Sequence, residues 1–166
     1  MGPKNTAEVD LMRNVPYLSA VGSLQYLATM TCPDIAYTVS YLARFNCNPG
    51  PKHWAVVKHL FRYFKGTLEY KLQYFGESGS VAFTTYTDAA HDDCIDSGHS
   101  TGGYVTMMAG GAIGWRSKLQ FIVALYTTEA EFVSAVEAGN KITWMCNILG
   151  EFGYPVTQPS ILYIDN

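Results

Sequence analysis

The sequence predicts a mixed α/β fold, in which a small helical segment precedes a mixed sheet of three antiparallel strands, a long helix and a further strand. Three observations predict it. Apolar residues recur at helical spacing over residues 15–66, the period then changes to alternation, and a second helical pattern covers 127–149. A helix packed on a sheet is the architecture that this order favours. We expect a helical segment at 1–67 and a sheet domain at 68–166.

Three short helices are expected in the first part. One covers about Tyr17–Thr31, one follows Pro33, and one covers His53–Lys65. The fixed backbone angle of Pro33 suits a first helical turn. Their apolar stripes are expected to be buried: Leu18, Val21, Leu24, Leu27 and Ala28; Ile35, Val39, Leu42 and Phe45; and Val57, Leu60, Phe61 and Phe64.

Basic residues form a row on the third helix, on the side away from its apolar stripe. Lys58, Arg62 and Lys65 are spaced i, i+4, i+7, so they share one face and could follow a phosphate backbone. A solvated face of an amphipathic helix is the alternative explanation. Residues 1–76 carry a net charge of +4 and residues 77–166 carry −7. A basic region with an acidic site suits a nucleic-acid enzyme that uses metal ions, and a chance distribution of surface charge is the alternative.

Alternation of apolar and polar residues predicts the strands. Leu68–Tyr74 is expected to be a half-buried strand, followed by strands over Val81–Asp88, 101–108 and 112–118. Ala109-Gly110-Gly111 is a hairpin signal between the last two of these strands.

The long helix is expected to open near Thr127 and run toward Leu149. Thr128 with Glu131 three residues later fits a capping box at its start. Its buried side is expected to contain Phe132, Val136, Gly139, Ile142, Met145 and Leu149. A loop and a short apolar strand, Ile161–Asp165, follow it.

Three acidic residues occupy positions that would suit a metal-dependent nuclease. Asp88 and Asp165 each end a strand, and Glu129 lies in the first turn of the long helix. Their carboxylates would meet if the two strands are neighbours and the helix packs across them. Oxygen ligands favour Mg²⁺ or Mn²⁺, and two such ions about 4 Å apart can support phosphodiester cleavage. Taken singly, each residue also has a structural explanation, as a turn former, a charge at a helix N-terminus or a solubilising charge.

Ordered motifs along nearly the whole chain carry a family resemblance. They include Val15-Pro16-Tyr17, Asn48-Pro49-Gly50 with His53-Trp54, Tyr63-Phe64-Lys65-Gly66-Thr67, Tyr86-Thr87-Asp88-Ala89, Ser100-Thr101-Gly102-Gly103-Tyr104, Thr127-Thr128-Glu129-Ala130-Glu131 and Tyr163-Ile164-Asp165-Asn166. The sequence resembles the ribonuclease H region of Ty1/copia-type retrotransposon polyproteins, preceded by the tail of the reverse transcriptase.

The resemblance implies a function, a cofactor and a set of ligands. The family is expected to cut the RNA strand of RNA-DNA hybrids with two Mg²⁺ (or Mn²⁺) ions held by four acids, the first three matching Asp88, Glu129 and Asp165. The chain departs from the family pattern at Ala90, where an acid is common, and at His99 and Tyr126, where Arg and Ser are usual. The family's fourth acid lies beyond the end of the sequence, so one ion or none is expected here.

Two other functions stay open. The first alternative is a catalytically weak or inactive retrotransposon-derived fragment that acts by binding or self-association, with a homodimer formed through an exposed sheet edge. The second alternative is a module that binds a hybrid or RNA through Lys58, Arg62 and Lys65 with nearby Tyr63.

An intracellular, soluble protein is expected from the cysteines and the hydropathy. The four cysteines contain no C-x-x-C pair, which favours reduced thiols. The first twenty residues resemble no signal peptide, and the apolar stretches are shorter than the roughly 18 to 20 residues that span a bilayer.

Overall fold

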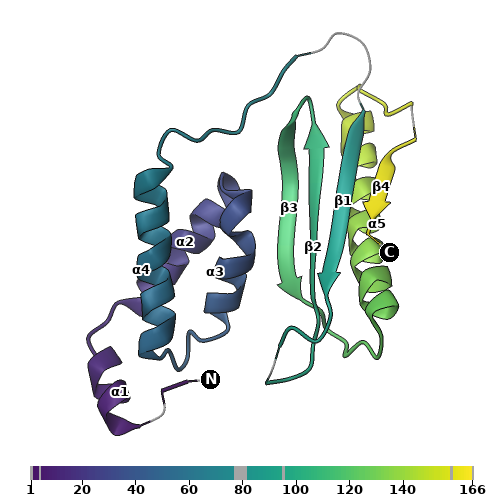
Figure 1. Cartoon of the computed structure of the whole chain (residues 1–166). Coiled ribbons are helices and arrows are strands. Elements are labelled where there is room, and N and C mark those ends of the chain that lie inside the picture. Colours follow the sequence, from purple (N-terminus) through teal and green to yellow (C-terminus); the bar gives the residue numbers. More distant parts are fainter. Residues whose placement is uncertain (1, 4, 77–81, 95, 158, 166) are drawn as a thin grey trace. The chain divides into compact units, whose positions relative to one another are not determined.

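The computed structural model describes residues 2–3, 5–76, 82–94, 96–157 and 159–165 (Figure 1). It confirms the mixed α/β class, with a four-stranded mixed sheet and a long helix. The chain divides into two compact units, Met1–Lys71 and Leu72–Asn166. All four cysteines are free thiols. In the described part of the chain, no helix has the length and apolar character needed to cross a membrane.

The first unit is helical. It contains α1 (Thr6–Met12), α2 (Tyr17–Met30), the short 3-10 helix η1 (Pro33–Ile35), α3 (Ala36–Ala43) and α4 (Pro51–Gly66). Its core is formed by large apolar side chains from all of these elements: Met12, Tyr17, Val21, Leu24, Ala28, Ile35, Val39, Leu42, Val57 and Leu60. Helix α1 was not expected from the apolar periodicity. The Asn5 side chain caps its start by accepting a hydrogen bond from Glu8 N at 2.9 Å.

Two residues of the expected apolar stripes are exposed. Leu18 is 64% exposed and Phe61 is 45% exposed, so the prediction that both are buried was wrong. In α2 the adjacent Tyr17 takes the inward position, and its hydroxyl donates to Leu42 O at 2.9 Å. Burial raises the pKa of Tyr17 to about 12. In α4, Val57 and Leu60 supply the buried side, which leaves Phe61 beside the basic face.

The second unit is a sheet with one long helix (Figure 1). Its strands are β1 (Phe83–Ala90), β2 (Thr101–Met108), β3 (Gly111–Leu119) and β4 (Ile161–Ile164), in the spatial order β3-β2-β1-β4. The first three strands are antiparallel neighbours, whereas β4 pairs parallel with β1. The β2–β3 turn places Ala109 and Gly110 at positive φ, 52° and 79°, as a tight two-residue hairpin turn requires.

The expected strand over Leu68–Tyr74 does not form. Leu68 is 75% exposed, and turns at Thr67 and Tyr70 keep the backbone from extending there. Only the end of this segment approaches the sheet, where Phe75 N donates to Ala109 O at 2.7 Å and the Tyr74 hydroxyl donates to Ala112 O at 2.7 Å. Alternation alone predicted a strand, but a strand also needs a partner along its length.

Helix α5 (Thr127–Glu151) packs on the sheet through small residues. Its buried residues are Ala130, Glu131, Ser134, Ala138 and Met145. The expected buried face was therefore wrong for Phe132 and Val136, which are both exposed. Gly102 on β2 explains the close approach, because a Cβ at that position would lie 2.3 Å from Ser134 Oγ. The expected capping box is also absent: the N-cap is Tyr126, without a side-chain cap, and Glu131 bonds elsewhere.

Candidate active site

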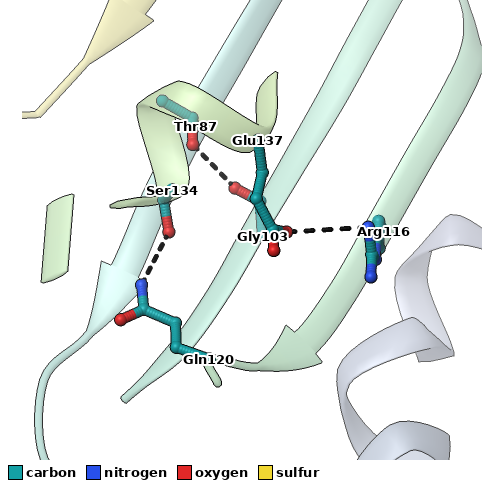
Figure 2. Close-up of polar contacts among 6 residues, drawn as sticks. All are labelled: Thr87, Gly103, Arg116, Gln120, Ser134 and Glu137. Carbon is teal, nitrogen blue, oxygen red and sulfur yellow. Dashed lines mark hydrogen bonds and ion pairs between the residues drawn. The ribbon is translucent and has the colours of Figure 1, made fainter. Parts of the chain in front are cut away.

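Polar contacts hold α5 in a defined position on the sheet (Figure 2). Gln120, which follows β3, donates through Nε2 to Ala130 O at 2.8 Å and to Ser134 Oγ at 3.2 Å. Farther along α5, Glu137 Oε2 lies 3.7 Å from Arg116 Nη1 on β3. Because the two hydrogen bonds of Gln120 are directional, they fix the rotation of α5 as well as its distance from the sheet.

Parallel pairing of β1 and β4 brings two of the predicted carboxylates to the same edge. Thr87 pairs with Ile164, and Asp88 and Asp165 are the residues that follow them. Two positions earlier on the same strands, the rings of Tyr86 and Tyr163 stack with centroids 5.1 Å apart. The carboxyl end of β1 points toward the end of the unit where α5 begins (Figure 1).

Glu131, near the start of α5, completes this group. It is only 8% exposed, and its Oε1 accepts a hydrogen bond from Ala89 N at 3.1 Å. The same N–H lies 2.9 Å from Asp88 Oδ1, so one backbone donor serves both carboxylates. Burial raises the pKa of Glu131, and the nearby charges of Asp88 and Asp165 raise it further, against the opposing effect of the Ala89 N–H. Asp88 and Asp165 themselves are exposed.

One oxygen of Glu131 is left without a partner. Its Oε2 is buried and accepts no hydrogen bond from any residue that the structure describes. Burying a carboxylate oxygen without a hydrogen-bond donor costs free energy. In native proteins such an atom usually has a reason, for example a catalytic role or a bound ion.

Glu129 lies outside the group. Its side chain is exposed, and its Oε2 accepts from Leu125 N at 2.7 Å, which closes the turn leading into α5. The structure thus brings together Asp88, Glu131 and Asp165. The sequence held one signal for Glu131: it lies in line with Ser134 and Ala138, at i+3 and i+7, on the small-residue side of the helix. Its apparent role in a capping box concealed that signal.

The carboxylates are neighbours rather than a finished coordination site. Over the residues that the structure covers, no three His, Cys, Asp or Glu side chains are arranged so that they could hold a metal ion as they stand. The donor set itself consists of carboxylate oxygens, which are the ligands that Mg²⁺ and Mn²⁺ prefer. A cation among these side chains would relieve their mutual repulsion and give Glu131 Oε2 a partner.

The predicted basic row lies on α4, in the other unit. Lys58, Arg62 and Lys65 are all exposed there. Tyr63, expected to act with them, turns toward another element: its hydroxyl donates to Asp34 Oδ2 at 2.5 Å, and this bond raises the pKa of Tyr63.

Comparison with known proteins finds relatives along most of the chain. The chain is 46% identical over 153 residues to a retrovirus-related Pol polyprotein from transposon TNT 1-94 of Nicotiana tabacum, covering 92% of the chain and 11% of that protein. It is 34% identical over 150 residues to a Pol polyprotein from transposon RE2 of Arabidopsis thaliana, covering 90% of the chain and 10% of the relative.

A shorter relative matches over nearly its whole length. Secreted RxLR effector protein 161 of Plasmopara viticola is 41% identical over 134 residues, which cover 81% of the chain and 94% of that protein. The chain thus spans about a tenth of the Pol polyproteins, at 11% and 10%, but almost all of this relative. A comparison with models of protein families finds no match.

Proposed function

The chain belongs to the copia-type retrotransposon Pol family, and on that premise we propose that its sheet unit is a ribonuclease H-type nuclease that hydrolyses the RNA strand of RNA-DNA hybrids. One observation carries the proposal. Glu131 is buried beside Asp88 and Asp165, one of its oxygens accepts no hydrogen bond from the described residues, and its pKa is raised by burial and then by the two neighbouring charges. A group of this kind suits a cationic ligand.

Each residue has a role that follows from its position. Asp88 and Asp165 extend from adjacent parallel strands toward solvent, where a phosphodiester can approach them. Glu131 Oε1 is held by the hydrogen bond from Ala89 N, so Oε2 is left directed away from that donor. Directional bonds to Gln120 keep α5, and with it Glu131, in register with β1.

The metal ion is part of the proposal. Mg²⁺ or Mn²⁺ would be held by Asp88, Glu131 and Asp165, and when bound it would supply activation of the attacking water and stabilisation of the leaving oxygen. Since no three side chains are arranged to hold an ion as they stand in the described part of the chain, binding requires the three carboxylates to draw together.

The test is cleavage of a labelled RNA-DNA hybrid by the full chain in the presence of Mg²⁺ or Mn²⁺. We expect cleavage that EDTA abolishes and that Asp88→Asn reduces by more than about 100-fold, because a direct ligand matters more than the supporting groups that cost 10- to 100-fold. Asp92→Asn is the matched control, since it removes the same charge from an exposed position just beyond β1. Cleavage that survives Asp88→Asn would reject the site.

A second candidate function is a non-catalytic fragment that acts by self-association. Strand β4 lies at one edge of the sheet, and its Ile161, Tyr163 and Ile164 are exposed. Exposed apolar edge strands can pair with another chain.

Size-exclusion chromatography separates this candidate from the nuclease. A dimer that Ile161→Lys converts to a monomer, in a chain that cleaves no hybrid, would favour the fragment. A monomer at all concentrations would reject it.

A further inference from the structure

Helix α4 presents a face that combines cations with an aromatic pocket. Trp54, Ala55, Lys58, Phe61 and Arg62 line a pocket of about 460 Å³, and Lys65 continues the same face one turn farther along. We define these six residues as the α4 face. The whole helix contains four Lys or Arg residues and no Asp or Glu. An ordinary solvated face mixes both signs of charge, so the composition here is one-sided.

The fold accounts for Trp54, which is partly buried against the apolar core, but not for the other side chains of this face. The core takes Val57 and Leu60 from the neighbouring side of α4, while Phe61 keeps 45% of its surface exposed. Among the described residues, no acid pairs with Lys58, Arg62 or Lys65, and no ring stacks on Trp54 or Phe61. Unpaired cations and an exposed phenyl ring are therefore available together to a ligand.

The start of α4 is held firmly, which preserves the shape of the face. His53 Nδ1 accepts from Gly50 N at 3.0 Å, and the His53 ring stacks on Phe45 with centroids 3.9 Å apart. Trp54 is the next residue, so its position follows from this fixed first turn.

The chemistry of the face selects the ligand. Lys58 and Lys65 are separated by about 10 Å along the helix axis, which allows successive contacts with a phosphate backbone. The aromatic lining requires a planar apolar group as well. A duplex stacks its bases away from solvent, whereas a single strand offers both phosphates and free base faces.

We infer that the α4 face binds single-stranded nucleic acid, with Lys58, Arg62 and Lys65 on phosphates and a base stacked in the pocket of Trp54 and Phe61. The inference rests on the proposed function, because a hybrid whose RNA strand is being degraded has single-stranded stretches next to it. Those stretches are the ligand that we assign to the α4 face. It extends the function by giving the helical unit a ligand of its own.

The experiment measures binding of the full chain to a fluorescent single-stranded RNA 12-mer by anisotropy, with EDTA present so that nothing is cleaved. Phe61→Ala should weaken binding by about 5- to 100-fold, the loss expected for one base–aromatic stack. Phe61→Tyr should retain binding, because it keeps the ring. Tyr26→Ala is the control, since it removes an exposed ring from α2 in the same unit.

Salt dependence tests the cations separately. Changing Lys58, Arg62 and Lys65 together to Gln should reduce the slope of log K against log salt by about 2, because each single-strand phosphate contact contributes about 0.7. Arg13→Gln, which removes an exposed cation already paired with Asp10, should leave the slope unchanged.

Several results would overturn the inference. They are equal affinity for a blunt hybrid duplex with no effect of Phe61→Ala, equal competition by polyglutamate, and absence of binding at low salt. Its failure is distinguishable from that of the nuclease proposal. Hybrid cleavage without single-strand binding overturns the inference alone, whereas Phe61-dependent binding without hybrid cleavage overturns the nuclease alone.

Discussion

The two units of this chain have different interiors. The helical unit is filled by large apolar side chains, and Leu24, Val39, Leu42 and Val57 are fully buried in it. The buried positions between α5 and the sheet are instead largely small or polar, including Thr85, Thr106, Ser134, Gln120 and Glu131. Apolar packing is non-directional and depends on volume, whereas hydrogen bonds fix direction. The polar contacts of the sheet unit therefore fix the placement of α5 on the sheet, and with it the position of Glu131.

Most polar groups of that interior are satisfied by one another. Thr85 Oγ1 and Thr106 Oγ1 lie 3.1 Å apart, and Thr87 Oγ1 donates to Gly103 O at 3.0 Å (Figure 2). In the described part of this unit, the buried side-chain atoms without partners are Gln120 Oε1 and Glu131 Oε2. Buried polar atoms without hydrogen-bond partners concentrate at functional sites. One of these two atoms, Glu131 Oε2, lies at the acidic edge of the sheet.

The largest expected effect is on the apolar core. Leu24→Ala should lower the free energy of unfolding by about 2 to 5 kcal/mol, because it leaves a cavity among large side chains. Leu18→Ala on the same helix is the control and should cost less than about 0.5 kcal/mol, since Leu18 is mostly exposed. Urea denaturation followed by circular dichroism measures both, and similar losses would contradict the assigned face of α2.

A smaller effect should follow from adding one methyl group to the close-packed sheet–helix interface. Gly102→Ala should cost about 1 to 3 kcal/mol in the same assay, because the new Cβ would meet Ser134 Oγ at 2.3 Å. Adding Ser134→Ala should recover part of that loss. Gly139→Ala, where a Cβ meets nothing within 4 Å, should be neutral or stabilising. A Gly102→Ala variant as stable as the parent would refute the close approach.

Neutralising Glu131 should stabilise the fold. Glu131→Gln keeps an acceptor for Ala89 N and removes repulsion from Asp88 and Asp165, so the free energy of unfolding at pH 7 should rise by about 0.5 to 2 kcal/mol. The folded-state pKa of Glu131 is raised above its ordinary value of 4.5. The raised pKa therefore stabilises the folded state of the parent chain fully below pH 4.5. This stabilisation is lost as the pH rises through the folded-state pKa.

Thermal unfolding from pH 4 to pH 8 measures this dependence. The difference between Glu131→Gln and the parent should be small at pH 4 and should widen as pH increases. A difference that stays constant over this range would show that the charge of Glu131 does not strain the fold.

The smallest effect is expected at the outer rim of the interface. Arg116→Ala should change the free energy of unfolding by less than about 0.5 kcal/mol, because its ion pair with Glu137 is long, at 3.7 Å, and partly exposed. A loss above 1 kcal/mol by urea denaturation would mean that this contact, and not the buried polar network, positions α5.

The contrast between the two interiors also explains what the sequence could predict. Leu24, Val39 and Val57 carry a strong hydrophobic signal at helical spacing, so the helices of the first unit followed from their periodicity. Strands β1 to β3 followed from their strand-like patterns and turn residues, and β4 followed from a short apolar run. The start of α5 was predicted from a capping box at Thr128 and Glu131, which the structure does not contain. The buried side of α5 did not follow, because Ala130, Ser134 and Ala138 carry little hydrophobic signal, while Phe132 on the exposed side carries much.

The site was predictable in part for the same reason. Asp88 lies near the end of β1 and Asp165 directly follows β4, and parallel pairing was enough to bring them to the same edge of the sheet. The choice between Glu129 and Glu131 depends on the rotation of α5 about its axis. That rotation is set by Gly102, Ser134 and Gln120, which are contacts between segments far apart in the sequence.

In this structure Glu131, and not Glu129, completes the acidic group with Asp88 and Asp165. Cleavage of a labelled RNA-DNA hybrid by Glu131→Gln and Glu129→Gln, measured side by side in Mn²⁺, tests it most directly. We expect Glu131→Gln to lose more than about 100-fold in rate and Glu129→Gln to remain within a few-fold of the parent, because it keeps the acceptor for Leu125 N. Loss of cleavage in Glu129→Gln with activity retained in Glu131→Gln would show that Glu129, and not Glu131, belongs to the site with Asp88 and Asp165.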